Sequence, residues 1–268
     1  MKLSFLAKWM LPLSVVCFTG LLFFGGCGQA MLSDEHLANR SKKEFSKMKQ
    51  QESMSTNYDH REMITRIGQN IAGVAQVDLP GTEWEFVVFN KDEPNAFAMP
   101  GGKVGVNRGL IDLASGNEDE IAAVMGHEIA HVALRHSNKR MSQAISLGVG
   151  GVILDVALRN QSSTDRMLGR AAYGVGSTVG LALPFSRSNE QEADHRGLYY
   201  SAMAGYDPRA AISFWQKMEA NNKGRRMPQF LSTHPNPGNR IQFLRENMER
   251  PLALYREAKI SRGETPNP

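Results

Sequence analysis

The amino-acid sequence predicts an α+β fold that is mostly helical and carries a small sheet of three or four strands. Apolar residues recur at helical spacing in residues 58–74 and again in 121–132. Between these stretches, the segments 84–89, 95–99 and 103–106 contain aromatic or β-branched residues and are separated by Pro, Gly and Asn. The length of 268 residues, with 41% apolar residues, suits one or two globular domains.

Residues 1–26 are predicted to be a signal peptide and not part of the fold. Lys2 and Lys8 give the first residues a positive charge, and the apolar run 11–24 that follows is short for a membrane span. The run ends in Phe-Phe-Gly-Gly before Cys27, which resembles a bacterial lipobox, although Phe24 stands where a small residue is more usual. The alternative is an uncleaved anchor helix.

The lipobox resemblance implies cleavage before Cys27 and lipid attachment to that residue. The only other cysteine, Cys17, lies inside the predicted signal, so the mature chain has no pair of thiols for an intramolecular disulfide. Gly28 follows Cys27, and by resemblance to Gram-negative sorting signals this favours the outer membrane over the inner. We therefore expect a protein of the bacterial cell envelope that faces the periplasm and contacts the membrane through its lipid.

The charge of the chain does not indicate a nucleic-acid partner. The net charge is +4, and removal of residues 1–26, with Lys2 and Lys8, would lower it to +2. Lys and Arg are scattered along the chain, which is typical of a solvated basic surface. We therefore predict no nucleic-acid binding.

The remainder divides into three predicted parts. Residues 27–57 are polar and form a tether with a loosely amphipathic helix, 58–255 form the main domain, and 256–268 form a flexible tail. Within 141–184 lie two apolar, glycine-rich segments, interrupted by Asp155 and Arg170 and shorter than about 18–20 apolar residues. Buried or site-covering helices are favoured there over membrane hairpins, and peripheral membrane contact stays open.

The stretch His127-Glu128-Ile129-Ala130-His131 lies inside the second helical pattern. Residues four apart lie on one face of a helix, so both imidazoles can reach one zinc ion, and Glu128 can hydrogen-bond a bound water. Asn117 followed by Glu120 resembles a capping box that starts this helix. The alternative is a chance match, with histidines that only find hydrogen-bond partners.

A catalytic zinc site needs a third protein ligand, and Glu190 is the candidate. Asp194 lies four residues later, on the same helix face, and can accept a hydrogen bond from the outer nitrogen of a ligand histidine. Glu192 points away on a regular helix and is expected to be solvated. A solvated acidic helix face is the alternative for Glu190 and Asp194.

Together these motifs resemble the gluzincin metalloendopeptidases of the CAAX prenyl endopeptidase/HtpX family. His-Glu-x-x-His followed by Glu-x-x-Ala-Asp is most similar to the soluble, periplasmic BepA- and LoiP-like and OMA-like branch. Residues 95–102 (Asn-Ala-Phe-Ala-Met-Pro-Gly-Gly), 186–187 (Ser-Arg), 232–235 (Ser-Thr-His-Pro) and 240–241 (Arg-Ile) resemble further elements of that family, in its order. The resemblance covers about residues 58–248 and implies a zincin-like domain.

The resemblance also implies roles for individual residues. One Zn²⁺ per chain would be held by His127, His131 and Glu190, with Glu128 as general base and Asp194 hydrogen-bonded behind a ligand histidine. His234 would stabilise the oxyanion or, in a closed state, take the open position on zinc; a structural turn residue is the alternative. The predicted edge strand, which would pair with an extended substrate, consists of Asn95, Ala96, Phe97, Ala98 and Met99. Structural roles alone are expected for His36, His60, His136 and His195.

The expected function is therefore a lipid-anchored zinc endopeptidase that cleaves unfolded or misassembled envelope proteins. One alternative is an assembly factor or chaperone that uses the protease fold mainly to bind clients. Another is a structural zinc module, which would need four protein ligands.

Overall fold

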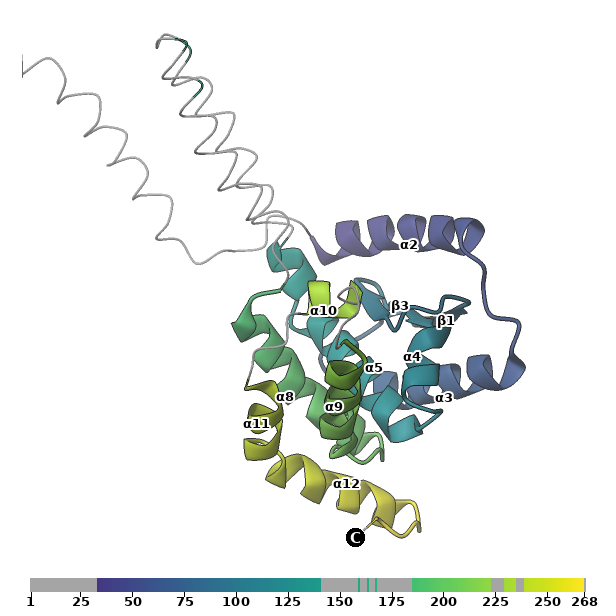
Figure 1. Cartoon of the computed structure of the whole chain (residues 1–268), viewed down its shortest axis with the longest axis vertical. Helices are drawn as coiled ribbons and strands as arrows, with labels where there is room; N and C mark the ends of the chain where they lie inside the picture. Colours follow the sequence, from purple (N-terminus) through teal and green to yellow (C-terminus); the bar gives the residue numbers. More distant parts are fainter. Residues whose placement is uncertain are drawn as a thin grey trace, which may run out of the picture. The chain divides into compact units, whose positions relative to one another are not determined.

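The computed structural model describes residues 33–140, 185–222, 229–234 and 239–267, together with the single residues 159, 163 and 167. These residues belong to one compact unit, Leu32–Pro268. The predicted fold class is confirmed, because the unit is mostly helical with one small sheet (Figure 1). The predicted signal peptide, Cys27 and the apolar cores of the 141–184 region lie outside the described residues.

Helix α2 (Asp34–Gln51) occupies much of the predicted tether. It starts at Ser33, whose side chain accepts a hydrogen bond from the backbone N–H of His36. Its buried residues are four apart, and the last of them, Phe45, packs edge-on against Phe89 and against Phe97. This helix is therefore attached to the sheet through an aromatic contact.

Helix α3 (Tyr58–Ala75) and three strands follow. Within the described ranges the strands β1 (Glu85–Phe89), β2 (Ala96–Met99) and β3 (Lys103–Asn107) form one sheet in the order β1-β3-β2. Strand β3 pairs in parallel with β1 and antiparallel with β2, so β2 lies at an edge as predicted.

The register of β2 decides which of its backbone groups face outward. Asn107 N–H donates to the Asn95 carbonyl at 2.9 Å, and Ala96 and Ala98 lie opposite Val106 and Val104. Because hydrogen-bonded and non-hydrogen-bonded pairs alternate in an antiparallel ladder, the backbone groups of Ala96 and Ala98 point away from β3.

The short helix α4 (Arg108–Leu113) leads to α5 (Glu118–Ala133), the most buried of the described helices. Asn117 caps α5 by accepting from the N–H of Glu120, and every residue from Glu120 to Val132 is buried. The helix ends at Ala133, and Arg135 then adopts a left-handed conformation with φ 56°. This turn changes the direction of the chain directly after the His-Glu-x-x-His sequence.

Helix α8 (Arg187–Met203) packs directly on α5. A Cβ added at Gly197 would lie 2.8 Å from the backbone nitrogen of His127, so the two backbones approach as closely as glycine permits. Helices α9 (Ala210–Asn222), α10 (Gln229–Thr233), α11 (Arg240–Glu246) and α12 (Glu249–Ser261) complete the unit.

The predicted boundary at residue 256 falls inside α12. Tyr255 is buried, and its hydroxyl accepts a hydrogen bond from the N–H of Asn267, so the chain past this point is still attached. Among the described residues, none of the helices combines the length and apolar character needed to cross a bilayer.

Candidate metal centre

Helices α5 and α8 bring the three predicted ligands together. His131 Nε2 lies 3.0 Å from His127 Nε2 and 3.3 Å from Glu190 Oε1, and His127 Nε2 lies 3.5 Å from Glu190 Oε2. All three side chains are buried. His127 and His131 share one face of α5 because they are one turn apart, and Glu190 faces them from the first turn of α8, which Ser186 caps.

These distances suit a zinc ion. Bonds of about 2.0–2.1 Å from a tetrahedral ion place its ligand atoms about 3.3 Å apart, close to the spacing observed here. The charges also suit a divalent cation: the carboxyls of Glu128, Glu190 and Asp194 are buried, and one buried guanidinium, Arg240, pairs with Glu190 and Asp194. With the carboxyls ionised and the histidines neutral, two negative charges are left without a compensating side chain.

His234, at the end of α10, joins the same cluster. Its Nδ1 lies 3.1 Å from Glu190 Oε1 and 3.4 Å from His127 Nε2, and the four possible ligand atoms lie within 4.8 Å of one another. His234 is buried, and its ring stacks on that of Phe230. In this conformation it stands where a fourth ligand would stand.

Glu128 lies beside the cluster without joining it. Its Oε1 is 3.4 Å from His234 Nε2 and has no hydrogen-bond partner, although the atom is buried. Burial raises the pKa of Glu128, while His234, His127 and a hydrogen bond from the Ala98 backbone lower it in part. A buried carboxylate with a raised pKa, one atom of which is free to accept a proton, has the properties of a general base.

Asp194 and Arg240 lie behind His127. Asp194 Oδ1 is 2.9 Å from His127 Nδ1, as predicted for the outer nitrogen of a ligand histidine. Arg240 donates to Glu190 Oε2 at 3.1 Å and to Asp194, and its guanidinium lies 3.6 Å from the centre of the Trp215 ring. The sequence analysis placed Arg240 in a family motif but assigned it no contact with the site.

His136 and Glu192 make contacts that the sequence did not predict. His136 was expected to be only structural, yet it is buried and its Nδ1 lies 2.9 Å from His131 Nδ1. Glu192 is half-exposed as expected, but its Oε2 lies 3.2 Å from His136 Nε2. Neither contact could be predicted from the spacing of these residues in the sequence. His36, His60 and His195 do not belong to the cluster.

The buried carboxylates determine where positive charge is favoured. Burial and Arg240 lower the pKa of His127, but hydrogen bonds to Asp194 and Glu190 outweigh them and raise it to about 9. Burial lowers the pKa of His131 well below its usual value, so this ring is neutral and its lone pair is available. Burial tends to raise the pKa of Glu190, but hydrogen bonds from His127, His131 and His234 lower it overall. Positive charge is therefore favoured beside the buried carboxylates of Glu190 and Asp194.

A cavity of about 340 Å³ connects the cluster with the edge strand. Its wall includes the whole predicted strand from Asn95 to Met99 together with Glu128, His131 and His234. A segment that entered this cavity along β2 would therefore reach Glu128.

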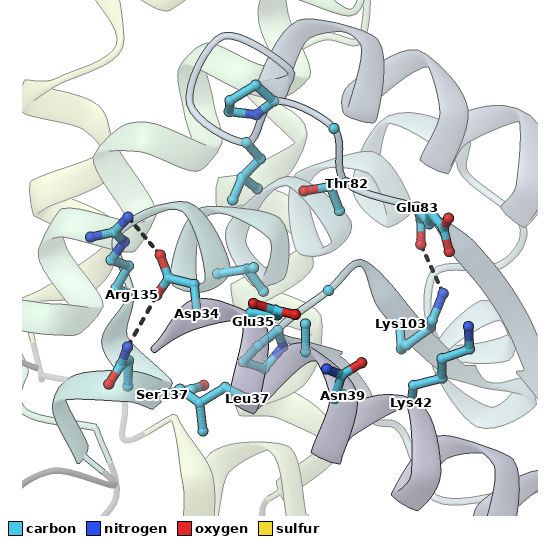
Figure 2. Close-up of a pocket in the computed structure, with 18 of the residues that line it drawn as sticks. Asp34, Glu35, Leu37, Asn39, Lys42, Thr82, Glu83, Lys103, Arg135 and Ser137 are labelled. Atoms are coloured by element: carbon cyan, nitrogen blue, oxygen red, sulfur yellow. Dashed lines mark hydrogen bonds and ion pairs between the residues drawn. The ribbon is translucent and has the colours of Figure 1, made fainter. Parts of the chain in front are cut away.

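A second cavity, of about 580 Å³, lies between α2, the loop before β1 and the end of α5 (Figure 2). Asp34 pairs with Arg135 at 2.6 Å, and Lys103 donates to the Glu83 carbonyl at 2.8 Å. The first interaction joins the start of α2 to the turn that follows α5, and the second joins β3 to the loop before β1. Of the four clustered side chains, only His131 borders this cavity.

Comparisons with known proteins agree with this geometry. The model of peptidase family M48 matches residues 59–248. The chain is 35% identical over 193 residues to the mitochondrial metalloendopeptidase OMA1 of Arabidopsis thaliana, covering 71% of this chain and 37% of that protein. It is 36% identical over 185 residues to the OMA1 protein of Schizosaccharomyces pombe, covering 68% and 51%.

A bacterial protein is similar as well. The chain is 32% identical over 200 residues to the beta-barrel assembly-enhancing protease of Escherichia coli K12, covering 71% of this chain and 40% of that protein. The chain thus spans about half or less of the length of these three relatives. The family resemblance predicted from the motifs is confirmed.

Proposed function

This chain belongs to peptidase family M48, and we propose that it is a zinc-dependent endopeptidase. The observation that carries the proposal is the position of Glu128. Its carboxylate lines the cavity along β2 and lies 3.4 Å from His234, which clusters with the donor atoms of His127, His131 and Glu190. A protein that only bound polypeptides would not need a free carboxylate at this point.

His127, His131 and Glu190 would hold the ion, a ligand set typical of catalytic zinc. A bound zinc supplies Lewis acidity, which acidifies water and polarises the scissile carbonyl. Asp194 accepts from His127 Nδ1 and so keeps the lone pair of Nε2 directed at the site.

Glu128 carries the proton through the reaction. Its unpartnered Oε1 accepts a proton from the attacking water, and the same carboxyl then donates it to the leaving nitrogen. The raised pKa caused by burial favours the first transfer, because a more basic carboxylate accepts the proton more readily. His234 Nε2, 3.4 Å from Glu128, is close enough to stabilise the oxyanion after a small displacement of the ring.

Strand β2 is the proposed substrate support. The outward-facing backbone groups of Ala96 and Ala98 lie along the cavity and can pair with an extended polypeptide. Main-chain pairing contributes affinity with little dependence on side chains, which suits cleavage of unfolded segments. The N–H of Ala98 already donates to Glu128 and is therefore not available to the substrate. This bond instead connects strand β2 to the proposed general base.

We propose that the enzyme is attached to the bacterial outer membrane by lipid on Cys27 and cleaves unfolded or misassembled envelope proteins. The support is the lipobox-like sequence before Cys27 and the similarity to the E. coli protein whose name describes β-barrel assembly. Other relatives are named as mitochondrial, so the compartment rests on the N-terminal sequence and not on the family.

A second candidate function follows from His234. Four protein ligands make a closed zinc site, and His234 Nδ1 stands at the fourth position. A chain that remained in this conformation would be a latent protease, or an assembly factor that binds clients without cleaving them.

Three forms of the chain test the proposal: the unmutated protein, Glu128→Gln and His234→Ala. Zinc content and cleavage of casein are measured for each, with and without a chelator. We expect zinc in all three forms and chelator-sensitive cleavage of casein by the unmutated form. The cleavage rate should fall at least about 100-fold in Glu128→Gln. It should also change in His234→Ala. Equal cleavage by Glu128→Gln and the unmutated chain would contradict the role of Glu128.

The same experiment separates the two candidates. Zinc in all forms with cleavage only after His234→Ala would establish the latent state. Zinc in all forms with cleavage in none would favour the assembly factor.

A further inference from the structure

We propose that His136 and Glu192 are positioning residues for His131: together they fix the tautomer and ring orientation in which His131 Nε2 faces the metal site. The proposal rests on the ligand role of His131 proposed above. His136 and Glu192 are not among the proposed metal ligands, and the general-base mechanism does not use them. The present proposal gives both side chains a function.

The three side chains form a continuous hydrogen-bonded row. His131 Nδ1 lies 2.9 Å from His136 Nδ1, and His136 Nε2 lies 3.2 Å from Glu192 Oε2. Ser188 donates to the other oxygen of Glu192 at 3.2 Å, which holds the carboxylate from the solvent side. Phe185 stacks on the His131 ring at 4.2 Å between centroids and limits its tilt.

Only one arrangement of protons satisfies the row when His131 Nε2 is a ligand. The lone pair of Nε2 must then face the site, so the proton of His131 is on Nδ1 and is donated to His136 Nδ1. His136 therefore carries its own proton on Nε2 and donates it to Glu192. Every N–H donor in the row then has an acceptor. Because Glu192 at the end can only accept, it determines the direction in which both hydrogen bonds are donated.

The backbone is arranged to allow this contact. On a continuous helix, residues five apart differ by about 140° around the axis, so His136 would point away from His131. Helix α5 instead ends at Ala133, and Arg135 takes a left-handed conformation, φ 56°, that brings His136 back to His131. Such a conformation is unfavourable for a non-glycine residue, so the surrounding contacts must stabilise it.

Helix α8 then serves both histidines. Glu190 supplies a ligand atom, Asp194 accepts from the outer nitrogen of His127 directly, and Glu192 acts on the outer nitrogen of His131 through His136. Removing such outer partners typically lowers metal affinity 10- to 100-fold, about the effect expected here.

The test measures zinc affinity by competition with a chromogenic chelator, using the full chain in the Glu128→Gln background to prevent self-cleavage. The variants are His136→Leu, Glu192→Ala, Glu192→Gln and the double variant His136→Leu/Glu192→Ala. Glu44→Ala is the matched control, since Glu44 is 49% exposed, against 48% for Glu192, and pairs with Lys47 of its own helix, α2. Thermal melting of the zinc-free forms reports any purely structural effect.

We expect His136→Leu to bind zinc about 10- to 100-fold more weakly and Glu192→Ala to be weakened in the same direction. Glu192→Gln keeps an acceptor oxygen and should recover most of the loss. The double variant should bind no more weakly than His136→Leu, because Glu192 acts through His136.

Unchanged zinc affinity in Glu192→Ala, or additive losses in the double variant, would overturn the proposal. So would a loss of affinity matched by a lower melting temperature of the zinc-free form, because that result would indicate a structural role. The Glu192 variants keep the test valid if His136→Leu does not fold, since Glu192 lies at the surface. Absence of zinc from the parent chain would instead contradict the proposed metal site itself.

Discussion

Arg240 is the cation that permits two carboxylates to be buried side by side. It is 1% exposed, donates to Glu190 and Asp194, and lies over the ring of Trp215. A guanidinium can bond both carboxylates at once because its donors lie in a planar fork, whereas an ammonium group acts as a point charge. Arg240 therefore helps to hold Glu190, a proposed ligand, and Asp194, which contacts the proposed ligand His127, in one arrangement.

Replacement of Arg240 by Met should leave both carboxylates buried without their guanidinium partner. Removing one partner of a buried ion pair costs about 3–5 kcal/mol, so we expect the free energy of unfolding of the zinc-free chain to fall by about that amount. Arg240→Lys should recover only part of the lost free energy of unfolding, because lysine lacks the planar fork of donors of a guanidinium. Urea denaturation measures the change, with Arg256→Met, at an exposed position on α12, as the control. An Arg240→Met curve that matches the control would show that the buried charges are compensated in another way.

At the scale of elements, the contact between α5 and α8 determines the geometry of the site. A Cβ at Gly197 would lie 2.8 Å and 2.9 Å from the backbone N and Cα of His127, and one at Gly126 would lie 2.9 Å from the carbonyl oxygen of Gly197. Two glycines therefore let the helices approach until Glu190 and Asp194 reach the histidines of α5.

Gly197→Ala tests this close approach, because the new methyl group must push α8 away from α5. Alanine favours a helix over glycine by about 1 kcal/mol, but overpacking costs about 1–3 kcal/mol, and the shift also displaces Glu190. We expect lower stability and at least about tenfold weaker zinc binding, measured by denaturation and chelator competition. Gly73→Ala in α3 is the matched control: no atom lies within 4 Å of the added Cβ, so this variant should gain up to about 1 kcal/mol and bind zinc normally. Normal zinc binding by Gly197→Ala would contradict a geometric role for this contact.

At the scale of the whole molecule, local patterns predicted the parts of the fold and site that depend on local geometry. Helical spacing located α3 and α5, and the four-residue spacing of His127 and His131 placed them on one face. The role of His136 was missed because it depends on the left-handed turn at Arg135, and ordinary spacing rules assume a continuous helix. The attachment of α2 was missed because its buried face is narrow and contributes one aromatic residue, Phe45, within a polar sequence.

The metal site should also contribute to the stability of the whole unit. Its ligands come from α5 and α8, with His234 at the end of α10, so one ion would hold together three elements that are distant in the sequence. A ligand that binds only the folded state at 1,000 times its Kd stabilises that state by about 4 kcal/mol. For a unit of this size such a gain corresponds to a rise in Tm of roughly 10 °C.

We therefore expect a chelator to lower the Tm of the full chain by roughly 10 °C and added zinc to restore it. Glu190→Gln removes a ligand charge and should abolish most of this zinc-dependent shift, whereas Glu44→Gln, at an exposed position on α2, should keep it in full. Differential scanning calorimetry at fixed protein concentration measures both. An equal shift in the two variants would mean that the stabilising zinc binds elsewhere. Loss of the shift in Glu190→Gln alone would place the ion between α5 and α8, where its binding joins the stability of the fold to the assembly of the catalytic site.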